Sequence, residues 1–364
     1  MKQRFLKKPF INLMIGTDMK GQGGVATVIS TYEECGFLSK HQVRLIITHS
    51  TNNRFGNAGA LIRFGLAILQ IIYLFMRFRV GLVHIHMSSR GSYQRKSLLV
   101  RLVKLLKGKV ILHLHGGEFR DFYTYECGEQ KKRHIRRTFE MVDKVLVLSS
   151  HWLAWSQEVL AYSEHVSVLY NAVPNLELNR DNVEKGRIAF LGRIGARKGA
   201  ADLLRAFRIV KIRCPCAKLS IAGDGEIDTH QKLAQELCLT QDVDFLGWVS
   251  GEEKKALLAK TDIYCLPSYN EGFPMGVIEA MSAGIVVVAS NVGGIPDAIT
   301  DRQQGLLIDA GDTTALASSL CELIENRNLN QQYVLDAKRK FDENFSLHAI
   351  IPQLHSIYDG LLAK

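Results

Sequence analysis

Apolar residues recur along the chain in short continuous runs, and each run is followed by a stretch with helical spacing. The first half holds six such runs, at residues 11–16, 43–49, 81–87, 109–115, 144–150 and 165–171. A second series of six follows, at residues 187–192, 217–223, 243–248, 263–268, 285–290 and 305–309. Runs of this kind are typical of parallel strands that helices cover on both faces. The pattern therefore predicts an α/β protein.

A polar stretch that carries Pro174 separates the two series. We therefore predict two doubly wound, Rossmann-like domains, residues 1–172 and residues 186–344, that face each other across a cleft. In such sheets ligands bind at the carboxyl ends of the strands. The last helical pattern comes after the second sheet is complete, and we expect this helix, within residues 345–364, to pack back on the first domain. With 364 residues, 47% of them hydrophobic and 23% charged, the chain is globular rather than disordered.

Cysteine usage and the apolar segments bear on the cellular compartment. The seven cysteines are odd in number and scattered, which does not suit a disulfide framework, so we expect a reducing cytoplasm. The basic start of the chain lacks the apolar core of a signal peptide. The longest apolar block, residues 64–76, has 13 residues. Because a membrane span needs roughly 18 or more, we expect this block not to cross a bilayer.

Charge is spread unevenly between the halves. Residues 1–172 hold 25 lysines and arginines against 11 acids, and no acid stands between Glu34 and Glu118. Such a surface attracts an anionic partner. The basic amphipathic helix expected at 97–109, the basic run 131–137 and the apolar block together favour peripheral attachment to an anionic membrane surface; a core helix with a solvated face is the alternative for 97–109. Nucleic acid is disfavoured because the basic stretches lack interleaved aromatics and any known nucleic-acid-binding signature.

A glycine-rich loop follows the first strand and leads into a helix that begins near Val25. Gly21, Gly23 and Gly24 let backbone amides approach an anion at the amino end of that helix; a turn that serves packing alone is the alternative. The spacing also satisfies the dinucleotide pattern GxGxxA. However, Thr48 and His49 stand at the end of the second strand, where an NAD site needs an acid for the ribose. We therefore disfavour an NAD-dependent oxidoreductase.

Two loops of the second half carry charged residues at strand ends. Arg193 and Lys198 follow the strand at 187–192, and two cations at this spacing can clamp a diphosphate; solvated loop charges are the alternative. In segment 268–284, Glu271 precedes a helix and Glu279 lies inside it, so each carboxylate can accept two vicinal hydroxyls of a sugar or ribose. Residues 273–275 would offer the amino end of that helix to a phosphate.

These motifs together resemble family 4 of the retaining nucleotide-sugar glycosyltransferases, which have the GT-B fold. The resemblance rests on E-x7-E in EGFPMGVIEAMSAG (271–284), GRIGARKG (192–199), IAGDGE (221–226) and FLGWV (245–249). The first half matches more loosely, through the glycine-rich loop and HLHGGE (113–118). The resemblance covers about residues 187–325 in order and spacing.

The resemblance implies a role for each residue at the expected site. Arg193 and Lys198 would bind the donor diphosphate, Glu279 the nucleotide ribose, and Glu271 the transferred sugar. Gly272, Phe273 and Pro274 would line the sugar site, and the backbone around Val249 would border the base. Gly23 and Gly24 would approach the diphosphate from the first domain. His115 would lie near the reactive carbon of the sugar. In the mechanism proposed for the family, the leaving phosphate oxygen deprotonates the acceptor hydroxyl.

We expect no metal and no other cofactor, because two cations and a helix amino end can stabilise a departing diphosphate. The DxD pattern at Asp242 and Asp244 begins a predicted strand and is interpreted as a structural turn. A zinc site is rejected because no helix or loop offers His and Cys at ligand spacing. In each histidine pair, 84/86 and 113/115, we expect one member to be ordinary packing on one side of the sheet, and His115 to reach the cleft.

The sequence thus predicts a metal-independent, retaining hexosyltransferase of bacterial cell-surface polysaccharide or lipopolysaccharide biosynthesis. It would move a sugar from a UDP- or GDP-sugar to a lipid-linked or oligosaccharide acceptor. We expect it in the cytoplasm, peripheral on the inner face of the cytoplasmic membrane. A noncatalytic partner that keeps the fold and binds a glycan or a sister enzyme is the alternative, which the charged residues at positions 193, 198, 271 and 279 disfavour.

Overall fold

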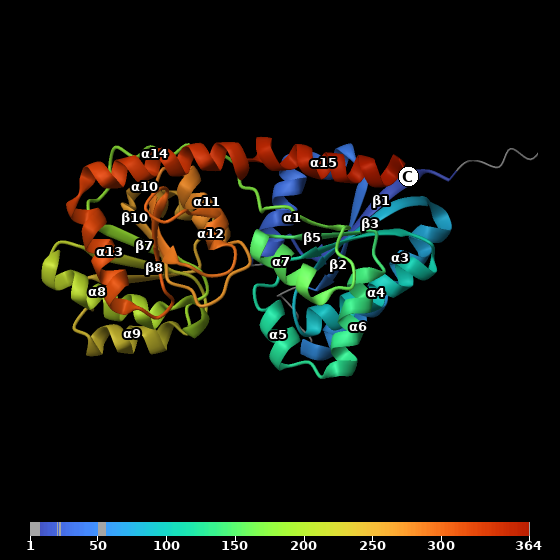
Figure 1. Ribbon diagram of the computed structural model, residues 1–364, viewed down its shortest axis with the longest axis horizontal. Helices are drawn as coiled ribbons and strands as arrows, with labels where there is room; N and C mark the ends of the chain where they lie inside the picture. Colours follow the sequence, from blue (N-terminus) through green and yellow to red (C-terminus); the bar gives the residue numbers. More distant parts are fainter. Residues whose placement is uncertain (1–7, 20, 22, 50–55, 364) are drawn as a thin grey trace, which may run out of the picture. The chain divides into compact units, whose positions relative to one another are not determined.

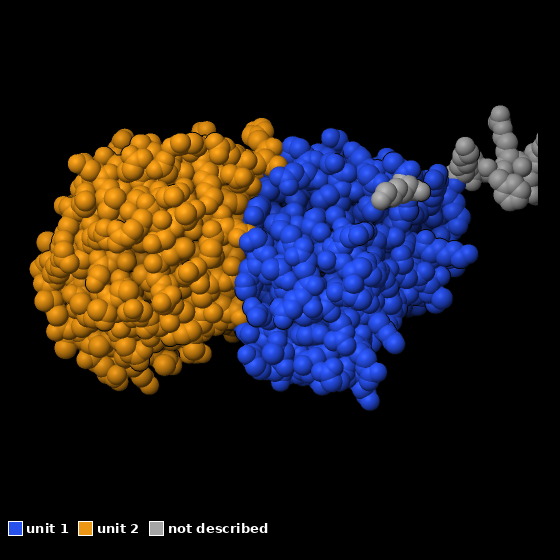
Figure 2. All heavy atoms as spheres, in the orientation of Figure 1, with its two compact units in different colours: residues 1–170, 350–364 blue, residues 171–349 orange. Residues whose placement is uncertain are grey.

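A computed structural model describes residues 8–19, 21, 23–49 and 56–363, so positions 20 and 22 of the glycine-rich loop lie outside the described residues. The chain divides into two compact units (Figure 2). Unit 1 comprises residues 1–170 and 350–364, and unit 2 comprises residues 171–349. In each unit, helices alternate with the strands of a six-stranded parallel sheet (Figure 1). The predicted pair of doubly wound α/β domains is confirmed.

The sheet of unit 1 has the strand order β2-β1-β3-β4-β5-β6, and every pairing is parallel. The strands are β1 (Phe10–Thr17), β2 (Val43–His49), β3 (Arg79–Met87), β4 (Lys109–Leu114), β5 (Lys144–Val147) and β6 (Val166–Val168). The helices are α1 (Gly24–Glu34), α2 (Phe37–Lys40), α3 (Gly56–Arg77), α4 (Gly91–Leu105), α5 (Phe119–Tyr125), α6 (Glu129–Glu140) and α7 (Ser150–Val159). Central strands such as β4 are buried along nearly their whole length, as the unbroken apolar runs require.

The sheet of unit 2 has the strand order β12-β11-β10-β7-β8-β9. Its strands are β7 (Arg187–Leu191), β8 (Lys218–Ala222), β9 (Val243–Gly247), β10 (Ile263–Leu266), β11 (Val286–Ser290) and β12 (Gly305–Ile308). Its helical elements are the 3₁₀ turn η1 (Ala196–Lys198), α8 (Ala200–Arg213), α9 (Ile227–Glu236), α10 (Gly251–Lys260), α11 (Met275–Ser282), α12 (Ile295–Ala298), α13 (Thr313–Glu325) and α14 (Arg327–Asn344). The two edge strands differ in burial: Asp244 and Leu246 of β9 are exposed, whereas β12 is buried along most of its length.

The last helix, α15 (Leu347–Ala363), belongs to unit 1 from Ile350 onward. Its buried face contains Leu354 and Tyr358, both fully buried. A hydrogen bond of 3.0 Å joins the Tyr358 hydroxyl to Nδ1 of His84 on β3. Lys109 Nζ donates to the Leu361 carbonyl at 2.7 Å. The end of the chain therefore completes the packing of the first sheet.

Helix α3 (Gly56–Arg77) is longer than the apolar block at 64–76, and the expectation that it does not cross a bilayer stays a prediction. It runs for 22 residues, and the stretch from Gly59 to Arg77 is long and apolar enough, by length and composition, to cross a membrane. Counting only the uninterrupted block underestimated the helix because Arg63 lies inside it. Ala67, Ile71 and Leu74 are buried, a spacing that places them on one face, whereas only 17% of the stretch is buried. α3 is thus a surface helix of unit 1 with one packed face.

Helix α4 is also shifted from the expected position at 97–109. It begins at Gly91 and ends at Leu105. Lys107 has a positive φ of 58°, a conformation that cannot continue a right-handed helix. Lys109 is already the first residue of β4. The basic amphipathic segment is therefore helical only in its first part.

Candidate functional site

The loops that follow β7 and β10 pack against each other at the carboxyl edge of the second sheet. The amide of Tyr269 donates to the Arg197 carbonyl at 2.8 Å. Gly199 has φ 66°, and a Cβ atom there would lie 2.0 Å from the carbonyl oxygen of Pro267. Only glycine allows this approach without a backbone shift. The backbone therefore holds the two loops of the expected site together.

Across this contact, the expected residues Lys198 and Glu271 form an ion pair. Both side chains are largely buried, with 14% and 7% of their surface exposed. The hydroxyl of Ser268 donates to Oε1 of Glu271 at 2.7 Å, the same oxygen that Lys198 contacts. From the sequence we expected Lys198 to bind the diphosphate and Glu271 to bind the sugar. The structure shows that each is also the charge partner of the other.

Arg193 lies on a tightly held loop with an exposed side chain. The neighbouring Ile194 amide donates to the Asp224 carbonyl at 2.7 Å, and the Gly192 amide donates to Ala222 at 2.9 Å. A Cβ on Gly223 would lie 1.8 Å from the Gly192 carbonyl oxygen. The backbone position of Arg193 is therefore fixed while its guanidinium stays accessible.

Helix α11 carries the second expected carboxylate. Nζ of Lys254, on α10, lies 2.6 Å from Oε1 of Glu279. Gly276 lets the buried Tyr264 ring approach, since a Cβ there would lie 2.1 Å from the Tyr264 hydroxyl. Burial first, and then the charges of Glu279 and Glu271, raise the pKa of Tyr264 well above its ordinary value. Tyr264 is therefore a neutral hydroxyl that lies within electrostatic range of both carboxylates.

The turn before α11 is buried, including Gly272, Phe273 and Pro274. Pro274 is the N-cap residue rather than part of the first turn. Nδ2 of Asn171 donates to the Phe273 carbonyl at 2.9 Å. The expected residue Val249 lies in the loop after β9 and is half-buried.

Sequence reasoning missed four polar residues in this region. They are Asn171, Lys254, Ser268 and Tyr264. None of the four belongs to a motif of charged residues at fixed spacing. Asn171, Lys254 and Tyr264 are far along the chain from the groups that they contact, which are the Phe273 carbonyl, the Glu279 carboxylate and the Leu191 carbonyl. Only Ser268, three residues before Glu271, could have been considered from spacing.

In unit 1, the expected residues Gly23 and Gly24 form the amino end of α1. Gly23 is the N-cap residue, with φ 118° and no side-chain hydrogen bond to the helix. Both glycines are exposed, and an added Cβ would meet no atom within 4 Å in the described part of the chain. The geometry leaves room for a ligand close to the backbone amides.

The expected residue His115 belongs to an array of four histidine rings. His84 and His86 lie on β3, His113 lies on β4, and His115 directly follows β4. The expectation that the members of each pair would have different environments is wrong, because residues two apart on a strand share one face. Nε2 of His115 lies 2.8 Å from Nδ1 of His86, and Nε2 of His84 lies 3.2 Å from Nδ1 of His113. Burial lowers the pKa of His115 to about 3, so its imidazole is neutral at physiological pH.

Three of these histidines, at positions 84, 86 and 113, hold ring nitrogens within 4.8 Å of one another. The rejection of a zinc site considered helices and loops and overlooked two neighbouring strands. The rings of His84 and His86 are stacked at an interplanar angle of 16°. Because ring nitrogens bind metals in the ring plane, nearly parallel rings do not converge on one ion. The geometry favours a packed array, and the absence of a metal stays a prediction.

The DxD pattern has charge partners of its own. Oδ1 of Asp242 accepts from Lys218 Nζ at 2.9 Å and pairs with Lys211 at 3.0 Å. Asp244 lies on β9, with Oδ2 3.4 Å from Arg187 Nη1. These ion pairs join the amino ends of strands, at the edge of the sheet opposite to the expected site.

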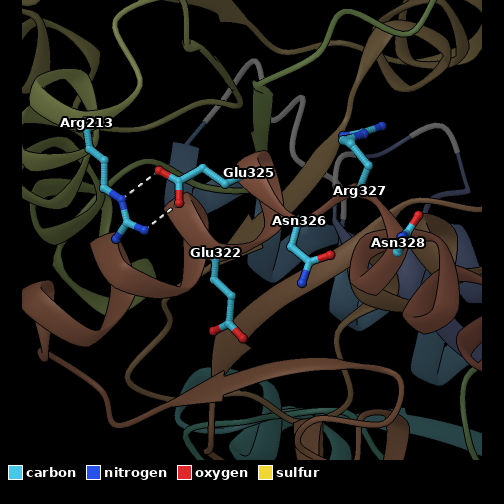
Figure 3. A pocket seen from close by; sticks show the side chains of 6 residues that line it. All are labelled: Arg213, Glu322, Glu325, Asn326, Arg327 and Asn328. Atoms are coloured by element: carbon cyan, nitrogen blue, oxygen red, sulfur yellow. Dashed lines mark hydrogen bonds and ion pairs between the residues drawn. The ribbon is translucent and has the colours of Figure 1, made fainter.

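Figure 3 shows a pocket at that opposite edge of unit 2. It is lined by Arg213, Glu322, Glu325, Asn326, Arg327 and Asn328. Arg213 Nε donates to Glu325 Oε1 at 2.6 Å. Arg327 pairs at 2.7 Å with Asp262, which precedes β10, whereas Ser268 and Glu271 follow that strand. The pocket is therefore separate from the expected site.

Comparison with known proteins finds a family similar to most of unit 2. Residues 177–340 match the family model described as "Glycosyl transferases group 1". This segment is therefore similar to the group 1 glycosyl transferases. The matched segment contains the loops after β7 and β10 and the carboxylates of Glu271 and Glu279. Asn171 lies outside it.

Relatives and solved structures extend the likeness beyond the matched segment. The amylovoran biosynthesis glycosyltransferase AmsK of Erwinia amylovora is 28% identical over 298 residues, which cover 78% of this chain and 71% of that protein. Sucrose-phosphate synthase of Thermosynechococcus elongatus has a TM-score of 0.79 at 18% identity, with 98% of this chain and 100% of that chain covered. HepE of Anabaena, solved with UDP and glucose, has a TM-score of 0.74 at 18% identity and covers 96% and 99%.

The structural neighbours are glycosyltransferases of the GT-B fold, which confirms the predicted fold class. The family and the fold support a transferase, with homologues in bacterial polysaccharide biosynthesis.

Proposed function

We propose that the protein is a retaining, metal-independent glycosyltransferase. It moves a sugar from a UDP- or GDP-sugar to a lipid-linked or oligosaccharide acceptor during assembly of a bacterial cell-surface polysaccharide, of which lipopolysaccharide is one class. The buried ion pair between Lys198 and Glu271, in a segment similar to the group 1 glycosyl transferases, carries the proposal. The relationship to AmsK supports the polysaccharide assignment, and the UDP bound to HepE supports a nucleotide donor.

The ion pair suggests how the site responds to its donor. A diphosphate that reaches Lys198 competes with Glu271 for the ammonium group, and its binding releases the carboxylate toward the sugar. Arg193, exposed on a fixed loop, adds a second cation to the diphosphate. The two cations and the amino end of α11 stabilise the departing diphosphate in place of a metal. The leaving phosphate oxygen then takes the proton of the acceptor hydroxyl, and His115 stands beside the reactive carbon.

The test is calorimetric titration of the full chain with UDP, GDP, dTDP, ADP and NAD, each with and without a chelator. We expect one nucleoside diphosphate to bind selectively and to keep its affinity in the chelator. If no nucleotide binds, the result favours the alternative of a noncatalytic binding partner. Binding of NAD alone would overturn the proposal. NMR of the product then gives its anomeric configuration, and inversion relative to the donor would contradict the retaining mechanism.

We also propose that the protein works in the cytoplasm, attached to the inner face of the cytoplasmic membrane through α3. The exposed side of α3 carries six large apolar side chains, each more than half exposed. They are Leu61, Ile62, Leu66, Leu69, Tyr73 and Met76. Because the opposite side packs on the sheet through Ala67 and Ile71, an in-plane orientation keeps unit 1 folded, whereas a transmembrane one would remove α3 from it.

Flotation with phosphatidylcholine vesicles, with and without phosphatidylglycerol, tests this attachment. We expect the chain to float with the anionic vesicles at low salt, and a Leu66→Gln, Leu69→Gln variant to stay in solution. Leu335→Gln is the matched control, since Leu335 is 64% exposed in unit 2. A wild-type chain that stays in solution would contradict the attachment, and one that high salt and alkaline carbonate cannot release would contradict the in-plane orientation.

A further inference from the structure

Four basic side chains gather at the carboxyl edge of the first sheet, apart from the expected site residues. Arg63 lies on α3, Arg95 and Lys96 on α4, and His49 ends β2. Lys96 Nζ donates to the hydroxyl of Thr48, the residue before His49. Burial and the charges of Arg95, Lys96 and Arg63 together lower the pKa of His49. Two helices and one strand therefore bring these four basic side chains to one place, which we call the cation cluster.

Among the described residues, no acid compensates the charges of the cation cluster in the observations below. Lys96 is only 4% exposed. Nε of Arg63 and Nε of Arg95 are buried and have no hydrogen-bond partner among the described residues. Within the described chain, no carboxylate contributes to the pKa shifts of Lys96, Arg95 or His49. Buried donors and charges are normally paired in proteins, so this arrangement points to an anion that comes from outside the chain.

The surrounding backbone adds to the positive potential. α4 begins at Gly91, and its N-cap residue Arg90 has φ 53° and makes no side-chain cap. The first turn of this 15-residue helix contains no acid of its own, and the nearby carboxylates of Glu118 and Glu126 are paired with Arg90. A Cβ on Gly91 would lie 3.3 Å from Nη1 of Arg95, which places that guanidinium beside the first turn. The nearby residue Asp18, whose amide donates to the His49 carbonyl at 3.2 Å, is not among the causes of the pKa shifts of Lys96, Arg95 or His49.

We propose that the cation cluster binds a phosphate or diphosphate group of the acceptor. Two guanidinium groups and an ammonium match the two or more negative charges of such a group better than the single charge of a carboxylate. The charge of Lys96 also acts on His86, which is hydrogen-bonded to His115. An anion held here lies close to the histidine expected near the reactive carbon. The acceptor assignment rests on the proposed function, whereas the anion site itself does not.

The experiment measures calorimetric binding of inorganic pyrophosphate to the full chain. The background is an Arg193→Ala, Lys198→Ala variant, which removes the expected clamp of unit 2. We expect pyrophosphate to bind this background with one site, and Arg63→Gln with Arg95→Gln to weaken that binding by at least about tenfold. The control pair, Arg101→Gln and Lys107→Gln, removes the same charge from exposed positions of unit 1 and should change affinity less than about twofold.

Two results would overturn the proposal. One is the absence of pyrophosphate binding in the background variant, and the other is equal weakening by the cluster pair and the control pair. The variants Arg63→Lys and Arg95→Lys keep the positive charges and control for a folding defect. They should keep most of the pyrophosphate binding that the glutamine variants lose. Nucleotide binding by Arg63→Gln, Arg95→Gln in the otherwise wild-type chain should be unchanged. If that binding disappears, the cluster belongs to the donor site instead.

A second arm separates a soluble phosphate from a lipid headgroup. The same pair of glutamine variants is floated with phosphatidylcholine vesicles that contain phosphatidic acid. We expect their vesicle binding to match that of the Arg101→Gln, Lys107→Gln control while pyrophosphate binding is lost. If pyrophosphate never binds and only the cluster variants lose the vesicles, the site takes a lipid headgroup and the acceptor assignment is wrong. The nucleotide titration of the proposed function is independent of both arms.

Discussion

The two units treat charge in opposite ways. In unit 2, the carboxylates Glu271 and Glu279 each have a lysine partner within the unit, so the site is nearly neutral as it stands. In unit 1, Arg63, Arg95 and Lys96 gather without a carboxylate among the described residues. A compensated site exchanges partners when its ligand arrives, whereas an uncompensated one gains its first partner. The difference leads us to propose that the two units bind anions by different means.

The largest effect is expected from removing the exchangeable cation in unit 2. Lys198→Ala leaves Glu271 without its ion pair and the diphosphate without a buried ammonium. We expect kcat/KM for donor turnover to fall by about 100-fold or more. Arg208→Ala, an exposed cation on α8, should leave turnover near wild type. Turnover near wild type in Lys198→Ala would show that the diphosphate clamp is wrongly assigned.

The two carboxylates should separate binding from turnover. Glu271→Gln should lower kcat by more than about tenfold while nucleotide affinity changes little, because this carboxylate is expected at the sugar. Glu279→Gln should weaken nucleotide binding by about tenfold with a smaller effect on kcat, because it is expected at the ribose. Kinetics and calorimetry on both variants measure the split, and matching effects would contradict the division of roles.

The close packing of the loops in unit 2 can be broken at one glycine. Gly199→Ala places a Cβ atom against the Pro267 carbonyl, at a position whose backbone has the left-handed conformation. We therefore expect it to lower the free energy of unfolding by about 1–3 kcal/mol. Gly65→Ala on α3 of unit 1 meets no such obstacle and should stabilise by about 0.5–1 kcal/mol. Denaturant unfolding of both variants measures the difference. Equal stability of the two would contradict the role of Gly199.

The smallest effect concerns pH at the cation cluster. Burial, and then the charge of Arg95, lower the pKa of Lys96 from 10.5 to about 7. Lys96 is therefore charged below pH 7 and neutral above it, while Arg95 stays charged and the buried His86 stays neutral. Sulfate, whose charge is constant, should bind a few-fold more tightly at pH 6 than at pH 9. His49, beside Thr48 in the cluster, also gains charge toward acid and acts in the same direction.

Lys96→Met provides the control for this pH dependence. It removes the ammonium but keeps a long apolar stem in the buried position, so its sulfate affinity should vary much less with pH. A wild-type affinity that does not change between pH 6 and pH 9 would contradict a role for Lys96 in the cluster.

Much of the fold was predictable because parallel strands buried on both faces leave a simple pattern in the sequence. All twelve predicted runs coincide with strands of the two sheets. The errors lie at helix bounds: α3 extends beyond its apolar block past Arg63, and α4 ends before Lys107. An amphipathic helix includes polar positions that a search for continuous apolar residues counts as interruptions.

The site was predictable only in part. Residues within one loop, such as Arg193 with Lys198, share a motif that sequence spacing reveals. Contacts such as Lys254 with Glu279 join separate elements and leave no spacing signal. The histidines on β3 and β4 were misjudged for the same reason, since strand register places His84 beside residue 111 and its ring against His113.

The sequence by itself determined the two-sheet α/β fold, the charge asymmetry between the halves and the loops that carry the expected donor site. These properties depend on local periodicity and composition, which are written along the chain. Only the tertiary structure decided that Lys198 pairs with Glu271, and that Arg63, Arg95 and Lys96 meet with no acid among the causes of the pKa shifts given for the described residues. Such encounters depend on which strand ends lie side by side, and the packing of the whole sheet decides that.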